Sequence, residues 1–178
     1  MDRNAPILET ARLRLRPHRP GDLDAQAAMW ADPAVTRYIG TGAPSSRAQS
    51  WMRILAYAGH WSLCGYGYWA VAERETDRFI GEAGLANFER GVSALAHGLP
   101  ELGFAFAAEA HGKGFASETV AAILAWADAR PGFERTACMI DARHAASRRI
   151  AERTGYVLAE RLIANERETL LYLREQRR

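Results

Sequence analysis

Apolar and polar residues alternate in several short segments along the chain. In the first, from Leu8 to Arg16, Leu13 and Leu15 alternate with arginines. A period of two is typical of a strand with one wet face. Similar or wholly apolar runs bounded by turn residues predict further strands at residues 68–74, 79–85, 101–107, 136–141, 156–163 and 168–173.

Stretches between these strands carry helical signals. They predict helices at residues 22–30, 45–61, 116–129 and 145–154. Asp22 and the pair Ser45–Ser46 supply capping side chains, and Gly155 suits the position after the last helix. In the second helix the spacing predicts a buried stripe of Trp51, Ile54, Leu55 and Ala58.

This order of elements predicts an α/β (α+β) fold with a mixed, mostly antiparallel sheet of about seven strands and about four helices. Only in the segment from Glu101 to Asp141 is a helix expected to cross over from one strand to the next, so this pair alone should be parallel. The chain has 178 residues without a repeat or long linker, and we therefore expect one domain.

Composition and charge exclude several classes of protein. Hydrophobic residues make up 48% and charged residues 25%, which excludes a wholly disordered chain. No apolar run approaches the roughly 20 residues of a membrane span, so no membrane partner is expected. With 23 basic and 21 acidic residues the net charge is +2, too balanced to indicate specific nucleic-acid binding, although residues 130–178 are locally rich in arginine.

The cysteines and histidines indicate the cellular compartment and whether a metal site is expected. Cys64 and Cys138 lie far apart and match no metal spacing. We interpret them as reduced thiols of a cytoplasmic protein. The five histidines do not cluster with carboxylates at ligand spacing, so no metal is expected.

The most informative segment, H-G-K-G at residues 111–114, joins a predicted strand to a predicted helix. A helix N-terminus presents unpaired N–H groups, and glycines let an anion approach them closely. Lys113, the single lysine of the chain, adds a cation. The alternative is a simple tight turn with Lys113 in solvent. The segment matches neither a Walker loop nor a dinucleotide fingerprint.

Four segments carry a wider pattern. They are D-P-A-V-T-R-Y-I-G at residues 32–40, F-I-G-E-A-G-L at 79–85, E-L-G-F-A-F-A-A-E-A-H-G-K-G-F-A-S-E at 101–118 and D-A-R-H-A-A-S-R-R-I-A-E-R-T-G-Y at 141–156. In this order they resemble the GNAT acetyltransferase superfamily, in particular its RimJ/RimL type of ribosomal-protein N-terminal acetyltransferases. The likeness covers about residues 7–173 and implies a GNAT-like sheet in a single N-acetyltransferase domain over residues 1–178.

The resemblance implies acetyl transfer from acetyl-CoA, as co-substrate, to a primary amine by direct attack in a ternary complex. The family binds the CoA diphosphate on loop amides, which correspond here to His111, Gly112, Lys113, Gly114, Phe115 and Ala116. The preceding strand residues, Phe104, Ala105, Phe106 and Ala107, would pair with pantetheine where two parallel strands splay apart. Glu109 departs from the usual Gln or Arg.

The helix after Asp141 supplies a second match with two departures. His144 stands at the family's Asn position, where its ring remains a candidate for bonding the cofactor. Ala151 replaces the Tyr that acts as general acid elsewhere. Ser147 matches the serine of this branch, and its hydroxyl is a candidate proton donor and cofactor contact. The alternative for Ser147 is ordinary helix capping.

A carboxylate is expected to take the proton that the attacking amine loses. Glu101 is the first candidate and Glu82, on the neighbouring strand, the second. The N–H of Phe106 is expected to polarise the thioester carbonyl. The acceptor pocket should come from residues 32–42, the following helix and the final hairpin, with Tyr38, Glu82 and Asn87 as substrate contacts. The aromatic residues expected near it, most of them as core, are Trp30, Tyr38, Trp51 and Trp61.

Two other functions remain open at this stage. The missing Tyr and Asn would suit a non-catalytic acyl-CoA-binding sensor domain. The arginine-rich C-terminal part would suit docking to RNA or the ribosome, with an affinity that falls as salt rises. The acceptor amine, a protein N-terminus or a smaller molecule, is left undetermined, and the protein is expected to be a monomer or a homodimer.

Overall fold

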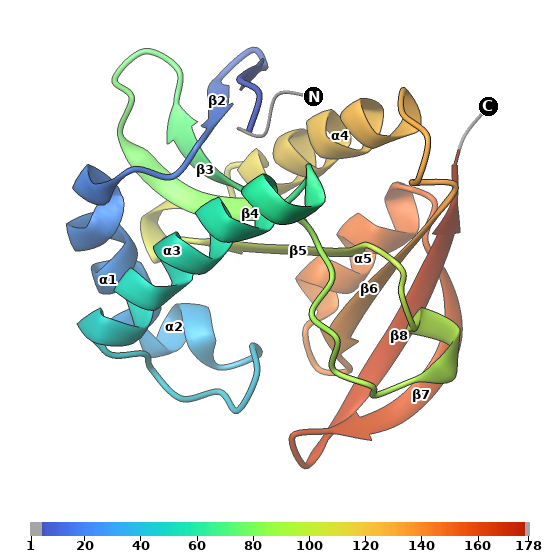
Figure 1. Cartoon of the computed structure of the whole chain (residues 1–178). Coiled ribbons are helices and arrows are strands. Elements are labelled where there is room, and N and C mark those ends of the chain that lie inside the picture. The colour runs from blue at the N-terminus through green and yellow to red at the C-terminus, as the bar shows by residue number, and fades with distance from the viewer. Residues whose placement is uncertain (1–4, 177–178) are drawn as a thin grey trace.

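The computed structural model describes residues 5–176 (Figure 1). Its strands are β1 (Leu8–Glu9), β2 (Leu13–Arg16), β3 (Tyr68–Glu73), β4 (Phe79–Ala86), β5 (Glu101–Phe106), β6 (Arg135–Asp141), β7 (Val157–Ala164) and β8 (Arg167–Glu175). Its α-helices are α1 (Leu23–Ala31), α2 (Pro33–Thr36), α3 (Arg47–Cys64), α4 (Phe115–Asp128) and α5 (Ala145–Arg153).

The strands form one eight-stranded sheet in the order β1-β2-β3-β4-β5-β6-β8-β7. Every neighbouring pair is antiparallel except β5 and β6, which are parallel. The predicted mixed sheet with a single parallel crossover is therefore confirmed. The last hairpin folds back so that β8, and not β7, pairs with β6.

The eighth strand arises because the predicted strand over residues 8–16 is broken. The N–H of Thr10 donates to the carbonyl of Leu13 at 2.9 Å, which closes a turn between β1 and β2. The two short strands then pair antiparallel, with Leu8 opposite Leu15. Arg12, predicted to lie on the strand's wet face, stands in this turn instead.

The helices agree with the predictions except in two places. Asp32–Pro33 does not simply end α1, because the Asp32 carboxylate accepts the N–H of Ala34 at 2.8 Å and starts α2. In α3, Ser46 forms the expected cap, but the predicted buried stripe is confirmed only for Ile54. The residues of α3 that are buried are Ser50, Ile54 and Trp61, while Trp51, Leu55 and Ala58 are exposed. Gly155 follows α5 at φ +95°, as expected.

The helices cover both faces of the sheet. Met29, Trp30 and Val35 from the α1–α2 region pack on one face, against Ala70 and Phe79. The other face packs against α4 and α5, in the larger core. Trp61, Trp69 and Trp126 stack edge to face in that core, with ring centroids 4.7–5.7 Å apart. None of the described helices has the length and apolar character needed to cross a membrane.

The two parallel strands share a single register pair, Glu101 with Ala137. Next to it the N–H of Ala137 donates to the carbonyl of Pro100 at 3.0 Å. Beyond this point the strands part, and β5 runs away from β6 toward α4 (Figure 1). The sheet therefore opens at its middle, between a half built on β1–β5 and a half built on β6–β8.

A buried ion pair ties the first half together. The guanidinium of Arg16 on β2 donates two bonds to the Asp22 carboxylate, which precedes α1, at 2.7 and 2.8 Å. The two side chains are only 7% and 3% exposed. Asp77 also accepts a bond from Arg16, at 3.1 Å.

Removing Asp22 should therefore destabilise the protein more than removing a neighbouring surface aspartate. We expect Asp22→Ala to lower the free energy of unfolding by about 3 kcal/mol, because it leaves a buried guanidinium short of its main partner. Asp24→Ala, which removes an 86% exposed carboxylate paired with Arg47, is the control and should cost less than about 0.5 kcal/mol. Urea unfolding measures both, and equal effects would contradict the argument.

Candidate active site

Two cavities meet where β5 and β6 part. The first, here called the loop cavity, has a volume of about 540 Å³ and extends to residues 110–117 at the start of α4. The second, the wide cavity, has a volume of about 700 Å³ and lies between α3, the loop after β4 and the β7–β8 hairpin. The residues that line both are Tyr38, Ile39, Phe104, Ala105, His144 and Ser147.

The turn before α4 presents main-chain N–H groups to the loop cavity. Gly112 and Gly114 adopt φ +74° and +80°, a conformation that glycine reaches without strain. Among the described residues, the N–H groups from Gly112 to Ala116 have no hydrogen-bond partner. The prediction for His111 is wrong, because its N–H donates to the carbonyl of Ala108 at 3.1 Å.

The charged side chains that line the loop cavity are all basic. No aspartate or glutamate lines it, whereas four arginines do, namely Arg37, Arg143, Arg149 and Arg153. The sequence indicated an arginine excess toward the C-terminus but not this convergence of α2, α5 and their flanking residues. Glu109, the departure from the family pattern, is exposed and lies 3.5 Å from Arg78. A cavity of this kind suits a polyanionic ligand.

The N-terminal segment holds the turn in place. The Arg12 guanidinium donates to the carbonyl of Lys113 at 2.9 Å and to the carboxylate of Glu118, in the first turn of α4, at 2.8 Å. The Glu118 carboxylate also accepts the hydroxyl of Thr10 at 2.6 Å. These bonds hold the pKa of Glu118 below its ordinary value, although desolvation opposes them. The sequence pattern gave no signal for this contact.

The free edge of β5 faces the gap between the two cavities. The N–H of Ala107 donates to the carbonyl of Ile80 on β4 at 2.9 Å. Because strand residues alternate, Ala105 also faces β4, while the main-chain groups of Phe104 and Phe106 point into the gap. The prediction is therefore wrong for the main chain of Ala105 and Ala107. The Phe106 carbonyl lies 2.8 Å from Nε2 of His111.

Ser147 and His144 act as a bonded pair at the junction of the cavities. The hydroxyl of Ser147, which is 7% exposed, lies 2.8 Å from Nδ1 of His144. This bond, rather than a capping bond to a main-chain N–H, uses the hydroxyl. The His144 ring stacks on Tyr38 with centroids 4.6 Å apart. Burial, followed by the charge of Arg37, lowers the pKa of His144, which favours the neutral ring.

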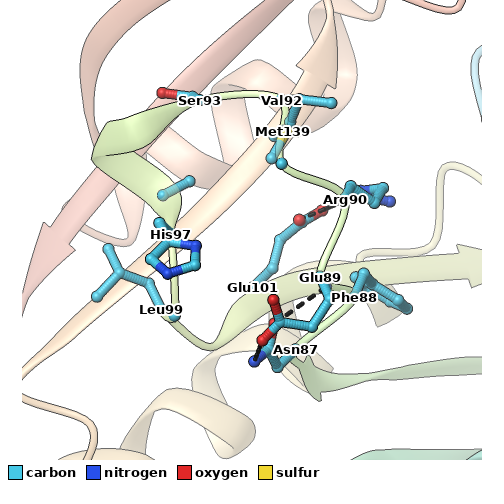
Figure 2. A pocket seen from close by; sticks show the side chains of 13 residues that line it. Asn87, Phe88, Glu89, Arg90, Val92, Ser93, His97, Leu99, Glu101 and Met139 are labelled. Carbon is cyan, nitrogen blue, oxygen red and sulfur yellow. Dashed lines mark hydrogen bonds and ion pairs between the residues drawn. The ribbon is translucent and has the colours of Figure 1, made fainter.

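Glu101 lies where β5 leaves β6, and its carboxylate lines the wide cavity. Figure 2 shows its one charged partner, the guanidinium of Arg90 from the loop after β4. Arg90 is largely exposed and stacks on Phe88, 4.6 Å from the ring centroid. Burial raises the pKa of Glu101, and Arg90 opposes that rise.

Glu82 is fully buried on β4, although it lines the same cavity. Its carboxylate accepts three hydrogen bonds from neutral donors: Gln26 Nε2 at 2.6 Å, Tyr57 Oη at 2.7 Å and Trp30 Nε1 at 3.1 Å. Burial raises its pKa despite these bonds.

Tyr68 places a third polar group near these carboxylates. Its ring stacks on Tyr57 with centroids 4.6 Å apart, and a Cβ built on Gly103 of β5 would collide with its hydroxyl. Gly103 therefore makes room for the Tyr68 hydroxyl at the wall of the wide cavity. Sequence reasoning did not identify Tyr68, since its position gave only a strand signal.

Some predicted residues lie elsewhere. Asn87 bonds Glu89 through its side chain at 2.6 Å and lines a small pocket beside Arg90, not the wide cavity (Figure 2). Of the aromatic candidates, Trp30 and Tyr38 line the wide cavity, whereas Trp61 is core and Trp51 faces solvent. No cluster of metal-ligating side chains occurs between residues 5 and 176.

A comparison with protein families shows to which family the chain belongs. A model of the acetyltransferase (GNAT) domain matches residues 12–157. The chain belongs to the GNAT acetyltransferase family.

Relatives and solved structures agree with this assignment. The uncharacterized N-acetyltransferase YoaA of Bacillus subtilis is 28% identical over 151 residues, 85% of this chain and 82% of that protein. A GNAT-family acetyltransferase from Bordetella pertussis has a TM-score of 0.84 at 28% identity, over 96% of this chain and 99% of that one. The GNAT member described here is therefore an acyl-CoA-dependent acetyltransferase.

The predicted likeness to RimL is also found at the level of the fold. RimL, a ribosomal-protein alpha-N-acetyltransferase solved in complex with coenzyme A, has a TM-score of 0.77 at 14% identity. The match covers 96% of this chain and 98% of RimL. The two proteins share the GNAT fold, and the coenzyme in that structure is a property of RimL.

Proposed function

We propose that this GNAT enzyme moves an acetyl group from acetyl-CoA to a primary amine, by direct attack of the amine while both substrates are bound in a single N-acetyltransferase domain. One observation carries the proposal: a gap beside the free edge of β5 joins a cavity rich in arginine and free N–H groups to a second cavity lined by three carboxylates, those of Glu82, Glu101 and Asp141. A phosphate-bearing thioester fits the first, and an amine fits the second.

The loop cavity would bind the coenzyme. The N–H groups of Gly112, Lys113, Gly114, Phe115 and Ala116 would hold the diphosphate, since they are unpaired and sit at the positive end of α4. The N–H and carbonyl of Phe104 and the carbonyl of Phe106 would pair with the pantetheine amides across the gap. When bound, acetyl-CoA supplies the thioester whose carbon the amine attacks.

Glu101 would accept the proton that the amine loses as the new C–N bond forms. The N–H of Phe106 would stabilise the charge on the thioester oxygen. Ser147 would donate its hydroxyl hydrogen bond to the sulfur as the C–S bond breaks, with the tautomer of His144 in which Nδ1–H donates to the serine oxygen. A thiol with a pKa of about 8.5 needs little more help to leave.

The wide cavity would hold the acceptor between Tyr38, Glu82 and the β7–β8 hairpin. The shared fold with RimL makes a peptide or protein N-terminus one candidate acceptor, and a small amine is the other. Free thiols at Cys64 and Cys138 would persist in a reducing compartment, so we place the enzyme in the cytoplasm.

Gly112→Val should abolish tight binding of coenzyme A. A Cβ on Gly112 meets no protein atom within 4 Å, so the added bulk enters the space proposed for the diphosphate. We expect the affinity to fall by about tenfold or more, measured by calorimetry.

Gly132→Val is the matched control for backbone strain. Gly132 also has positive φ, +91°, and open space around its Cβ, but it follows the other end of α4. This variant should bind coenzyme A like the parent protein. Retained affinity in Gly112→Val, or an equal loss in both variants, would remove the turn from the binding site.

Glu101→Gln should lower turnover by about 100-fold, because the amide cannot take a proton from the amine. The loss should be largest at pH values above the pKa of Glu101, where the carboxylate is ionised, and below the pKa of the amine, and it should shrink at lower pH. The affinity for coenzyme A should stay unchanged. A thiol-release assay across pH measures the effect, with Glu89→Gln, an exposed carboxylate of the neighbouring loop, as control.

Arg90→Met also tests the assignment of Glu101 as the base, by changing the pKa of the carboxylate instead of removing it. Arg90 lowers the pKa of Glu101, so its loss should raise that pKa further. Since the base acts in its ionised form, the acid limb of the pH–rate profile should move to higher pH. An unmoved limb, or full activity of Glu101→Gln, would exclude Glu101 as the base.

A further inference from the structure

Arg53 is a cation of the wide cavity that the proposed chemistry does not use. It projects from α3, lines the cavity beside Trp30, Tyr57 and Glu82, and stacks on the Trp30 indole 3.8 Å from the ring centroid. Its Nη1 atom is buried and has no hydrogen-bond partner among the described residues. Stacking on an aromatic ring fixes the guanidinium plane but leaves its in-plane N–H groups unused.

Glu82, the acid next to Arg53, does not satisfy these N–H groups. The Nε atom of Arg53 lies 4.0 Å from the Glu82 carboxylate, which is too far for a hydrogen bond. Both carboxylate oxygens already accept bonds from neutral donors, Tyr57 and Trp30 on one and Gln26 on the other. Burial also raises the pKa of Glu82, which weakens it as a counter-ion.

The other charges that line the cavity are bonded elsewhere. Asp141 accepts two bonds from the Arg143 side chain, at 2.6 and 2.9 Å. Glu101 pairs with Arg90, and Arg167 donates to the carbonyl of Arg37 at 2.8 Å. Within the described part of the chain, Arg53 is the charged lining residue whose side chain makes no hydrogen bond. Glu82 lies at ion-pair distance, but the buried N–H of Arg53 has no acceptor, and such a group is stabilised when an anion bonds it.

We propose that Arg53 binds a carboxylate of the acceptor, so that the substrate is an amine that carries a carboxylate a few atoms away. The planar fork of Arg53 matches a carboxylate in two parallel bonds. Two molecules offer this chemistry: a free α-amino acid, and a peptide whose first residue is acidic. The inference rests on the proposed function, because it assigns the acceptor of that same site.

The test compares acceptors that differ only in this group. Thiol release is measured with the common L-α-amino acids, each beside its carboxamide, and with amidated peptides that begin with Asp beside those that begin with Asn. We expect kcat/KM to favour the carboxylate member of one set by about 10- to 100-fold. The set that shows the preference identifies the source of the carboxylate.

Arg53→Met keeps a long apolar stem on Trp30 and removes the charge. It should lower kcat/KM for the carboxylate acceptor more than for its amide, mainly through KM, and so erase the preference. Arg53→Lys should retain part of it, because a point charge replaces the fork. Arg47→Met, the same change at an exposed position of α3, should keep the full preference, and thermal unfolding checks that all variants fold.

The outcomes separate this inference from the proposed function. Equal use of acids and amides by the parent enzyme, or equal losses for both in Arg53→Met, would overturn the role of Arg53 while acetyl transfer stands. If no acceptor is turned over, calorimetry with the same acids in the presence of coenzyme A measures whether they bind. Binding that depends on Arg53 would then keep the carboxylate site and reject the reaction, and absent binding would reject both.

Discussion

The pairing of β5 and β6 at a single residue pair is the constraint on which the site depends. A parallel pair normally continues its hydrogen bonds along both strands, whereas here the ladder stops at Glu101 and Ala137. Beyond that pair, the inward main-chain groups of Phe104 and Phe106 lack a strand partner. Main-chain N–H and C=O groups cost free energy when they are buried without a hydrogen-bond partner. The gap is therefore stable only when water, or an extended ligand with amides of its own, fills it.

The same opening determines where α4 begins. The crossover from β5 to β6 must pass over the gap, so the helix N-terminus lies at one end of it and aims its N–H groups inward. Gly112 and Gly114 allow the positive φ angles of this turn, but other residues make the hydrogen bonds that fix its position. Arg12 and Thr10 hold it by bonding Lys113 and Glu118, which makes the break between β1 and β2 part of the site.

Local patterns predicted most of the fold and the glycine turn before α4, because strand alternation, helix caps and a glycine-rich turn each depend on neighbouring residues. The parallel crossover followed from element order alone. The wrong predictions concern positions whose environment is determined by segments distant in the sequence. The outward face of α3 and the place of Asn87 outside the wide cavity depend on which elements pack together. The convergence of Arg37 with the arginines of α5, and the buried Nη1 of Arg53 without a hydrogen-bond partner, are likewise three-dimensional facts without a local sequence signal.

The two buried carboxylates differ in a way that separates their roles. Burial raises the pKa of each, yet Glu82 is surrounded by three neutral donors within the core, and both of its oxygens are occupied. A base must offer a lone pair to the incoming proton, and three of the roughly four acceptor positions of Glu82 already bond donors of α1 and α3. Glu101 is held by one arginine from an exposed loop, and an entering amine can replace that arginine without disturbing the core. This difference favours Glu101 as the proton acceptor and Glu82 as the fixed floor of the acceptor site.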